Sequence, residues 1–230
     1  MQEFIAYLPT LFNDRVMLNA IMTTFQLAVI STSVSTLLGV MIGLLLERKN
    51  FLGKRIVVRI NRTLMGMPPV VIGLITYLLL MRRGPLGAFS FLFTMTGMAI
   101  AQILIITPII SGMLYTAASR RAPAIRAFGK TMGATPKQTA WLLIKEMRHE
   151  IYFAMIAGFG RSISEVGAVM MVGGNIANRT RTMTTAISTL SRQGIFQEGI
   201  ILGVVLLVMA FILQTIVERI NKKEVYDENY

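Results

Sequence analysis

Four uncharged blocks constrain the fold of this 230-residue chain more than any other feature. They contain no Asp, Glu, Lys or Arg and are 31, 19, 36 and 19 residues long: 16–46, 63–81, 84–119 and 199–217. A membrane core about 30 Å thick requires about 20 apolar residues of helix. Charged residues make up 15% of the chain, against roughly 25% in a soluble domain. The sequence therefore predicts a multi-pass membrane protein.

We predict an all-α polytopic membrane protein with about five transmembrane helices in a single domain, residues 1–230. Besides the uncharged blocks, the segment 151–173 has the length and apolar content of a span, although Arg161 and Glu165 interrupt it. Proline lacks a backbone N–H, so kinks are expected at Pro68, Pro69 and Pro108. The expected spans are residues 17–46, 61–81, 93–119, 151–173 and 198–218.

Basic residues are distributed unevenly between the expected loops. Sixteen Lys and Arg residues lie in segments 47–62 and 120–150 and in the C-terminal tail, whereas six lie on the other side. Cytoplasmic loops of membrane proteins concentrate Lys and Arg. We therefore expect the N-terminus outside and the C-terminus in the cytoplasm of a cell-membrane protein. The formal charge of +12 follows from this asymmetry, and no nucleic-acid partner is expected.

The chain lacks the residues for several kinds of chemistry. It has no cysteine, which excludes disulfides, thiolate metal sites and cysteine nucleophiles, and its one histidine, His149, is interpreted as a loop residue. The tripeptide Gly129-Lys130-Thr131 ends like a phosphate-binding loop, but Ala124 stands where the first glycine is required. We expect no enzyme activity, no metal and no cofactor bound by this chain.

The longest polar segment, residues 120–150, has the periodicity of a helix rather than of a linker. Pro123 is expected to open a short helix, where its missing N–H costs nothing. Ile125, Phe128 and Met132 then form one apolar stripe. This stripe is compatible with a helix on the lipid surface and with a helix that inserts into a groove of a soluble partner.

A second helix is predicted after a glycine break at Gly133. Thr135 has the position of an N-cap, Pro136 is the first helical residue and Gln138 follows the cap by three positions. Together these residues predict a capping box.

Arg161 lies about 15 Å into its span at 1.5 Å per residue. A lone arginine at mid-bilayer costs about 2.5–3.5 kcal/mol on insertion scales, so we expect it to pair with Glu165, one turn later. The pair, with the intervening Ser164, is a candidate element of a pathway or gate. A purely structural ion pair remains an alternative.

The expected outer end of the same span carries Gly173, Gly174 and Asn175. Glycine pairs break helices, and the freed backbone N–H groups can point at an anion. These residues are a second candidate for a gate or docking surface, with an ordinary turn as the alternative.

Small residues recur every four positions in the first span: Ser31, Ser35, Gly39 and Gly43. Such spacing lets helices approach closely, so we predict helix packing here, including at a homodimer seam. The hydroxyl groups of this span are alternatively suited to line an anion path.

Residues 127–136, Ala-Phe-Gly-Lys-Thr-Met-Gly-Ala-Thr-Pro, resemble the EAA loop in membrane subunits of ABC importers. Ala127 and Phe128 stand where that motif has Glu and Ala. Residues 160–176 and 178–187, with Gly-Gly-Asn-Ile and Met-Thr-Thr-Ala-Ile, resemble the molybdate, tungstate and sulfate branch, and most of all tungstate permeases.

This resemblance implies an ABC importer permease of the type I-like fold, in which two copies form a pathway for an oxyanion, with tungstate favoured and molybdate or sulfate as alternatives. It implies a separate ATPase dimer that binds ATP and Mg, and an extracytoplasmic oxyanion-binding protein. The ATPase is expected to grip the cytoplasmic loop at Ile125, Phe128, Gly129, Met132, Gly133 and Ala134. A self-sufficient secondary transporter or channel is the alternative from another class, with Glu165 as its one available membrane carboxylate.

Overall fold

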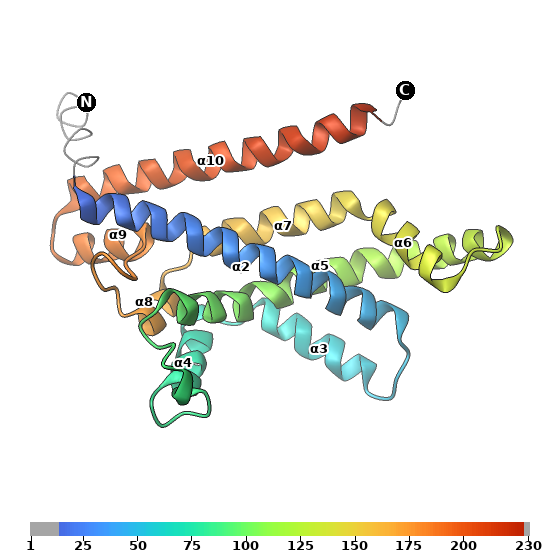
Figure 1. The fold of residues 1–230 in the computed structure, drawn as a ribbon, viewed down its shortest axis with the longest axis horizontal. Coiled ribbons are helices and arrows are strands. Elements are labelled where there is room, and N and C mark those ends of the chain that lie inside the picture. Colours follow the sequence, from blue (N-terminus) through green and yellow to red (C-terminus); the bar gives the residue numbers. More distant parts are fainter. Residues whose placement is uncertain (1–13, 228–230) are drawn as a thin grey trace. The chain divides into compact units, whose positions relative to one another are not determined.

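The computed structural model describes residues 14–227, with side chains through residue 215 and at Arg219. Within these residues every regular element is a helix and no strand occurs, which confirms the all-α prediction (Figure 1). The elements are α2 (Arg15–Arg48), α3 (Lys54–Met65), α4 (Pro69–Leu80), the 3₁₀ helix η1 (Gly87–Phe89), α5 (Met95–Thr131), α6 (Pro136–Glu146), α7 (Arg148–Ile163), α8 (Gly167–Gly173), α9 (Met183–Arg192) and α10 (Phe196–Asp227).

Three helices are long and apolar enough to cross a membrane, namely α2, α5 and the first 20 residues of α10, Phe196–Thr215. Two further spans result if α3 with α4, and α7 with α8, are each counted as one broken helix. The described residues therefore contain three to five candidate spans, in agreement with the multi-pass prediction. The expected division into five spans within one domain stays a prediction.

The segment 61–81, expected to be one kinked span, is divided between α3 and α4. Pro68 has extended backbone angles, and Pro69 occupies the first turn of α4. Proline at the first turn sacrifices no helical hydrogen bond, whereas it disfavours helical geometry in the residue before it. The two prolines therefore separate two helices.

Helix α5 corrects the prediction that Pro123 opens a new helix. Pro108 and Pro123 both lie inside α5, which continues to Thr131. Ala118 and Ala122, which precede Pro123, are fully buried in one hydrophobic cluster, and Ile125, which follows it, packs against the same cluster. Packing on both sides of Pro123 thus maintains the helix despite the lost backbone donor.

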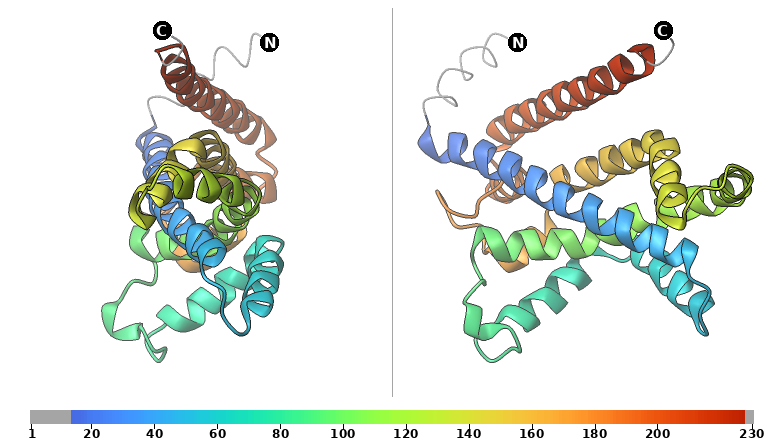
Figure 2. Two further views of the ribbon diagram at one scale, coloured as in Figure 1. Left: turned by 90° about the vertical axis from the view of Figure 1, so that its right-hand side faces the viewer. Right: turned by 45° about the vertical axis from the view of Figure 1, so that its right-hand side comes forward.

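The turn between α5 and α6 confirms the predicted second helix (Figure 2). Gly133 has a φ of 68°, which ends α5 in the left-handed region. The N–H of Thr135 donates to Oε1 of Gln138 at 2.8 Å, and the threonine hydroxyl accepts from the N–H of Gln138 at 3.4 Å. Pro136 is the first residue of α6, as predicted from the capping box.

The chain forms two compact units. One comprises the described residues up to Ser31, Pro68–Leu104, and those from Phe159 onward. In this unit α4 packs on α8, where a Cβ added to Gly73 would lie 2.7 Å from Cα of Ala168. Helices α9 and α10 enclose a cluster of Met183, Ala186, Leu190, Ile201 and Leu202.

The second unit comprises Thr32–Met67 and Ile105–Gly158. Its hydrophobic core joins α5, α6 and α7 through buried side chains that recur along α5 at helical spacing. This core consists of Ile106, Ile110, Leu114, Ala118, Ala122, Leu143, Met147 and Ala154.

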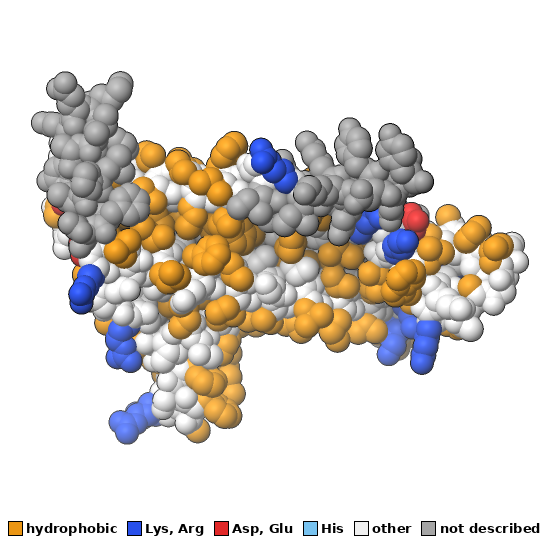
Figure 3. Space-filling model, turned by 45° about the horizontal axis from the view of Figure 1, so that its top comes forward, with side chains coloured by type: hydrophobic (Ala, Val, Ile, Leu, Met, Phe, Trp, Pro, Cys, Tyr) orange, Lys and Arg blue, Asp and Glu red, His pale blue; other side chains and the backbone are white. Residues whose placement is uncertain are grey.

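Large apolar side chains also cover much of the surface (Figure 3). Leu37 on α2 is 65% exposed, and Leu207 and Phe211 on α10 are 70% and 72% exposed. Large exposed apolar patches are unusual on soluble monomers, whereas a protein surrounded by lipid needs an apolar surface.

Candidate functional site

The break between α7 and α8 is organised by one buried carboxylate. Oε2 of Glu165 lies 3.0 Å from Nη2 of Arg161, and Oε1 accepts a hydrogen bond of 3.0 Å from the N–H of Ala168. Ala168 lies in the first turn of α8, where backbone N–H groups have no partner within the helix. The hydroxyl of Thr184 donates to the Glu165 carbonyl at 2.9 Å. Glu165 therefore both pairs with the arginine and caps α8.

The exposure of these side chains differs. The Glu165 side chain is 2% exposed and that of Arg161 is 31% exposed. Ser164 is exposed, and its hydroxyl donates to the Arg161 carbonyl at 3.2 Å. The structure thus brings these three predicted residues together, with the carboxylate turned inward and part of the guanidinium accessible.

A buried polar cluster next to this break was missed by sequence reasoning. Oε1 of Gln102 lies 2.7 Å from Oγ of Ser31 and 2.6 Å from Oγ of Ser162, and its Nε2 donates to the Ser162 carbonyl at 3.1 Å. All three residues are at most 3% exposed. The amide of Gln102 therefore links α2 and α5 to the last turn of α7. The available signal was that Gln102 is the only amide side chain in the uncharged block 84–119.

The second predicted gate element lies at the far end of α8. Gly174 and Asn175 have φ values of 70° and 50°, which end the helix in the left-handed region. A Cβ added to Gly173 would lie 2.4 Å from Sδ of Met98, so a larger residue there would displace this buried side chain. The predicted helix break at the glycine pair is present.

Side-chain hydrogen bonds hold the loop that follows. Asn175 donates from Nδ2 to the hydroxyl of Thr189 at 2.8 Å and accepts from Nε of Arg181 at 3.3 Å. The hydroxyl of Thr180 donates to the Gly173 carbonyl at 2.6 Å. Arg181 is thereby anchored at the loop by an amide oxygen.

The two predicted gate elements do not form one site. Glu165 precedes the first turn of α8 and Asn175 follows its last, and the seven residues of this helix span about 10 Å at 1.5 Å per residue. The Arg161–Glu165 ion pair lies at the start of α8, whereas the hydrogen-bonded loop that contains Asn175 lies at its end.

The small-residue stripe of α2 packs against α5 of the same chain. A Cβ added to Gly39 would lie 2.5 Å from Cγ2 of Ile110, and one added to Gly43 would lie 3.1 Å from three atoms of α5. Ser31 belongs to the Gln102 cluster, whereas the buried hydroxyl of Ser35 has no hydrogen-bond partner among the described residues. The close approach of α5 within the same chain therefore explains why small residues are present at Gly39 and Gly43.

The apolar stripe predicted in residues 120–150 is divided between two surroundings. Ile125 packs against the hydrophobic core of its own unit. Phe128 and Met132 are 57% and 70% exposed. Ile125 is half-buried and lies on the core side of α5, whereas Phe128 and Met132 face outward; the predicted contact of all three with an ATPase stays a prediction.

Trp141 completes the outward surface and was also missed. This α6 residue is 65% exposed and lines an open groove of about 600 Å³ with Phe128 and Met132. We refer to Phe128, Met132 and Trp141 as the α5–α6 surface. The sequence does contain a signal for it: Trp141 directly follows Ala140, so this large aromatic residue lies outside the apolar face formed by Ala140, Leu143 and Met147.

The remaining predicted loop residues shape the same groove. A Cβ added to Gly129 would lie 2.7 Å from Oγ1 of Thr139, so glycine permits the close approach of α6. Gly133 makes the left-handed turn, and Ala134 lines the groove and donates its N–H to the Gly129 carbonyl at 2.8 Å.

Comparison with known proteins gives a consistent group of relatives. The profile of the family described as "Binding-protein-dependent transport system inner membrane component" matches residues 35–223. The "Tungstate uptake system permease protein TupB" of Peptoclostridium acidaminophilum is 37% identical over 193 residues, covering 84% of this chain and 85% of the relative.

Two further relatives have similar coverage. A "Probable anion ABC transporter permease protein" of Haloferax volcanii is 38% identical over 184 residues, covering 78% of this chain and 79% of the relative. The "Tungstate uptake system permease protein TupB" of Campylobacter jejuni is 34% identical over 169 residues, covering 74% of this chain and 71% of the relative.

Proposed function

This chain belongs to the binding-protein-dependent transport system inner membrane family, and we propose that it is the permease subunit of an ATP-driven importer for tungstate. It is a multi-pass component of the cell membrane. The observation that carries the choice of anion is the 37% identity, over most of both chains, to a protein named as a tungstate permease. Two of the three reported relatives bear that name, and the third is named as an anion permease.

Two copies of the chain form the translocation pathway in this proposal. Apart from Glu198 and Glu218 at the two ends of the last expected span, the expected spans contain one carboxylate, Glu165. Its side chain is paired with Arg161 and accepts a hydrogen bond from the start of α8. A single copy therefore offers few groups with which to drive an ion or to line a polar channel. The paired charges at the break and the exposed part of Arg161 would contribute to the pathway from each copy.

The α5–α6 surface couples the permease to a separate ATPase. Three large apolar side chains stand exposed in an open groove, on a segment that is expected to lie outside the membrane. Such a surface suits a soluble partner that buries it. Ile125 supports this surface from the core side, and ATP with Mg is bound by the partner. Closure of the partner would move α5, α6 and the spans continuous with them.

An extracytoplasmic binding protein would deliver the anion at the loop after α8. Arg181 is half-buried, and its guanidinium donates a hydrogen bond to the side-chain oxygen of Asn175. A positioned cation on an ordered loop suits the docking of an anion carrier. Opening at Gly173 and Gly174 would then admit the anion.

The decisive experiment measures uptake of labelled tungstate into vesicles that contain the permease, its ATPase and its binding protein. Unlabelled tungstate should compete at the lowest concentration, ahead of molybdate and sulfate. Stronger competition by molybdate or sulfate would reassign the anion. Uphill uptake by the permease alone would instead support a secondary transporter and contradict the ATP-driven importer.

The predicted orientation can be tested directly because the chain has no cysteine. Single cysteines at Ser188 and Lys137 should react with a membrane-impermeant maleimide from opposite sides in intact cells. We expect Ser188→Cys to be labelled from outside and Lys137→Cys only after permeabilisation. The reverse pattern would overturn the assignment of the α5–α6 surface to the cytoplasm.

A further inference from the structure

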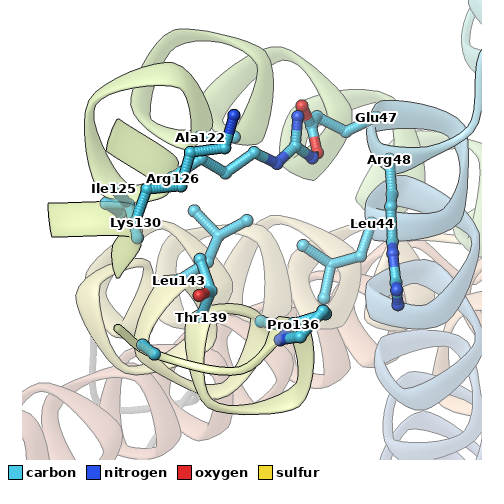
Figure 4. A pocket seen from close by; sticks show the side chains of 12 residues that line it. Leu44, Glu47, Arg48, Ala122, Ile125, Arg126, Lys130, Pro136, Thr139 and Leu143 are labelled. Carbon is cyan, nitrogen blue, oxygen red and sulfur yellow. The ribbon is translucent and has the colours of Figure 1, made fainter. Parts of the chain in front are cut away.

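A second cavity adjoins the groove of the α5–α6 surface, with which it shares the lining residues Ala134 and Thr139 (Figure 4). It holds about 230 Å³ of space, several times the roughly 30 Å³ of one water molecule in the liquid. Its walls come from the last turn of α2, the last turns of α5 and the first turns of α6. The apolar residues that line it are Leu44, Ala122, Ile125, Ala134, Pro136, Ala140 and Leu143.

Cations gather around this apolar interior. Arg48, Arg126 and Lys130 line the cavity, against one carboxylate, Glu47. Arg126 forms an ion pair with Glu47, and Figure 4 shows these two side chains pointing toward one another. Among the described residues, Arg48 and Lys130 have no acidic partner. Two uncompensated positive charges therefore face one apolar space.

The cavity also has a defined position along α2. The uncharged block of α2 ends at residue 46, and Glu47 and Arg48 follow immediately. The point where a spanning helix changes from apolar to charged residues marks the headgroup region of the membrane. With α2 as a span, the cavity therefore lies at headgroup depth.

We propose that this cavity binds the headgroup region of one anionic phospholipid. The phosphate would lie between Arg48 and Lys130, and the glycerol backbone and first acyl carbons would contact Leu44 and Leu143. Arg126, held by Glu47, would bound the site on the α5 side.

The mixed lining favours a lipid over a free inorganic anion. A hydrated oxyanion gains nothing from an apolar wall, whereas the carbon atoms of a lipid are stabilised by leaving water. Basic pockets between helices at the cytoplasmic surface are suited to anionic headgroups. The inference requires only that α2 spans the membrane, so it is independent of which anion the importer carries.

The test uses the full-length chain, purified in detergent and stripped of lipid, with phosphatidylglycerol or phosphatidylcholine added back. Native mass spectrometry should show one phosphatidylglycerol retained in preference to phosphatidylcholine. The double variant Arg48→Gln and Lys130→Gln should weaken this retention about 30-fold, since each cation near an anionic headgroup contributes about 1 kcal/mol.

Two further variants distinguish lipid binding in this cavity from nonspecific electrostatic attraction of anionic lipid to the protein surface. Ala140→Phe fills the cavity without changing charge and should also abolish the selective retention. The double variant Arg55→Gln and Arg59→Gln removes the same charge from exposed positions of α3 that do not line the cavity, and should retain the lipid.

Three results would overturn the proposal. They are equal retention of both lipids, equal weakening by the α3 variant, and occupation of the site by inorganic phosphate with no lipid retained. Loss of ATPase binding in the Arg48→Gln and Lys130→Gln variant, with lipid retention unchanged, would instead assign the cavity to the soluble partner. None of these readouts depends on transport, so failure here leaves the proposed import function untouched.

Discussion

The carboxylate of Glu165 lies 3.0 Å from the guanidinium of Arg161, across the break that separates α7 from α8. Its other oxygen accepts the N–H of Ala168 and thereby caps α8. The Glu165 side chain therefore has two roles: it forms the charge pair, and it accepts a hydrogen bond at the start of the next helix. This arrangement explains how a charged pair is accommodated where the apolar span is interrupted.

Glu165→Gln should lower the free energy of unfolding by about 2 kcal/mol, because a partly buried arginine loses its counter-charge. The double variant Arg161→Gln and Glu165→Gln should recover most of this loss, since neither charge then remains unpaired. Denaturant titration in mixed micelles measures both values.

Glu146→Gln, at an exposed position of α6, is the matched control and should change stability by less than about 0.5 kcal/mol. A double variant that is less stable than Glu165→Gln would show that the pair does not act as a unit. A stable double variant that loses tungstate uptake would assign Arg161 a direct role in the pathway.

Phe128→Asp should abolish coupling between ATP hydrolysis and uptake while leaving membrane insertion intact. A carboxylate in place of a 57% exposed phenyl ring removes apolar surface from the contact and adds a charge that the partner must desolvate. Trp141→Ala should reduce uptake in the same direction, as expected for a large aromatic anchor. Transport and ATPase rates in reconstituted vesicles provide the measurement.

Ala127→Asp introduces the same charge at a neighbouring exposed position outside the groove and serves as the control. Uptake at the rate of the unmodified protein in Phe128→Asp would remove this surface from the coupling proposal. So would equal damage from Ala127→Asp.

Gly39→Ala should destabilise the protein by about 1–3 kcal/mol through overpacking. The added Cβ would meet Cγ2 of Ile110 at 2.5 Å and the backbone N of Ser111 at 3.2 Å, so one of the helices must move. Gly203→Ala in α10, where nothing lies within 4 Å of the new atom, should be neutral or stabilising. Equal thermal midpoints for the two variants would contradict the observed α2–α5 contact.

Gln102→Leu should cost about 1–3 kcal/mol, because the carbonyl of Ser162 loses its side-chain donor and the hydroxyls of Ser31 and Ser162 each lose one acceptor. The volume of the side chain is nearly conserved, so the loss reports hydrogen bonding rather than a cavity. Gln197→Leu, at an exposed position of α10, is the control in the same unfolding assay. A Gln102→Leu variant as stable as the control would mean that the cluster contributes no net free energy.

The membrane class and several local features follow from the sequence alone, because each depends on residues close together in the chain. Uncharged blocks predict spans from their length, and the capping box of Thr135 and Gln138 lies within four residues. The Arg161–Glu165 pair is one helical turn apart and forms as expected. Local chemistry is enough to specify such contacts.

Other features were decided by which distant residues became neighbours. Pro123 lies within α5 because Ala118 and Ala122 are buried in one core, and Ile125 is half-buried because it packs against that same core. Gln102 gains its role only when α2 and α7 reach it. The sequence by itself determined that the chain spans a membrane and where many of its helices begin and end, since these depend on local apolar length and on caps. The tertiary structure alone decided which side chains meet and which remain exposed, because burial depends on packing between segments that no local pattern records.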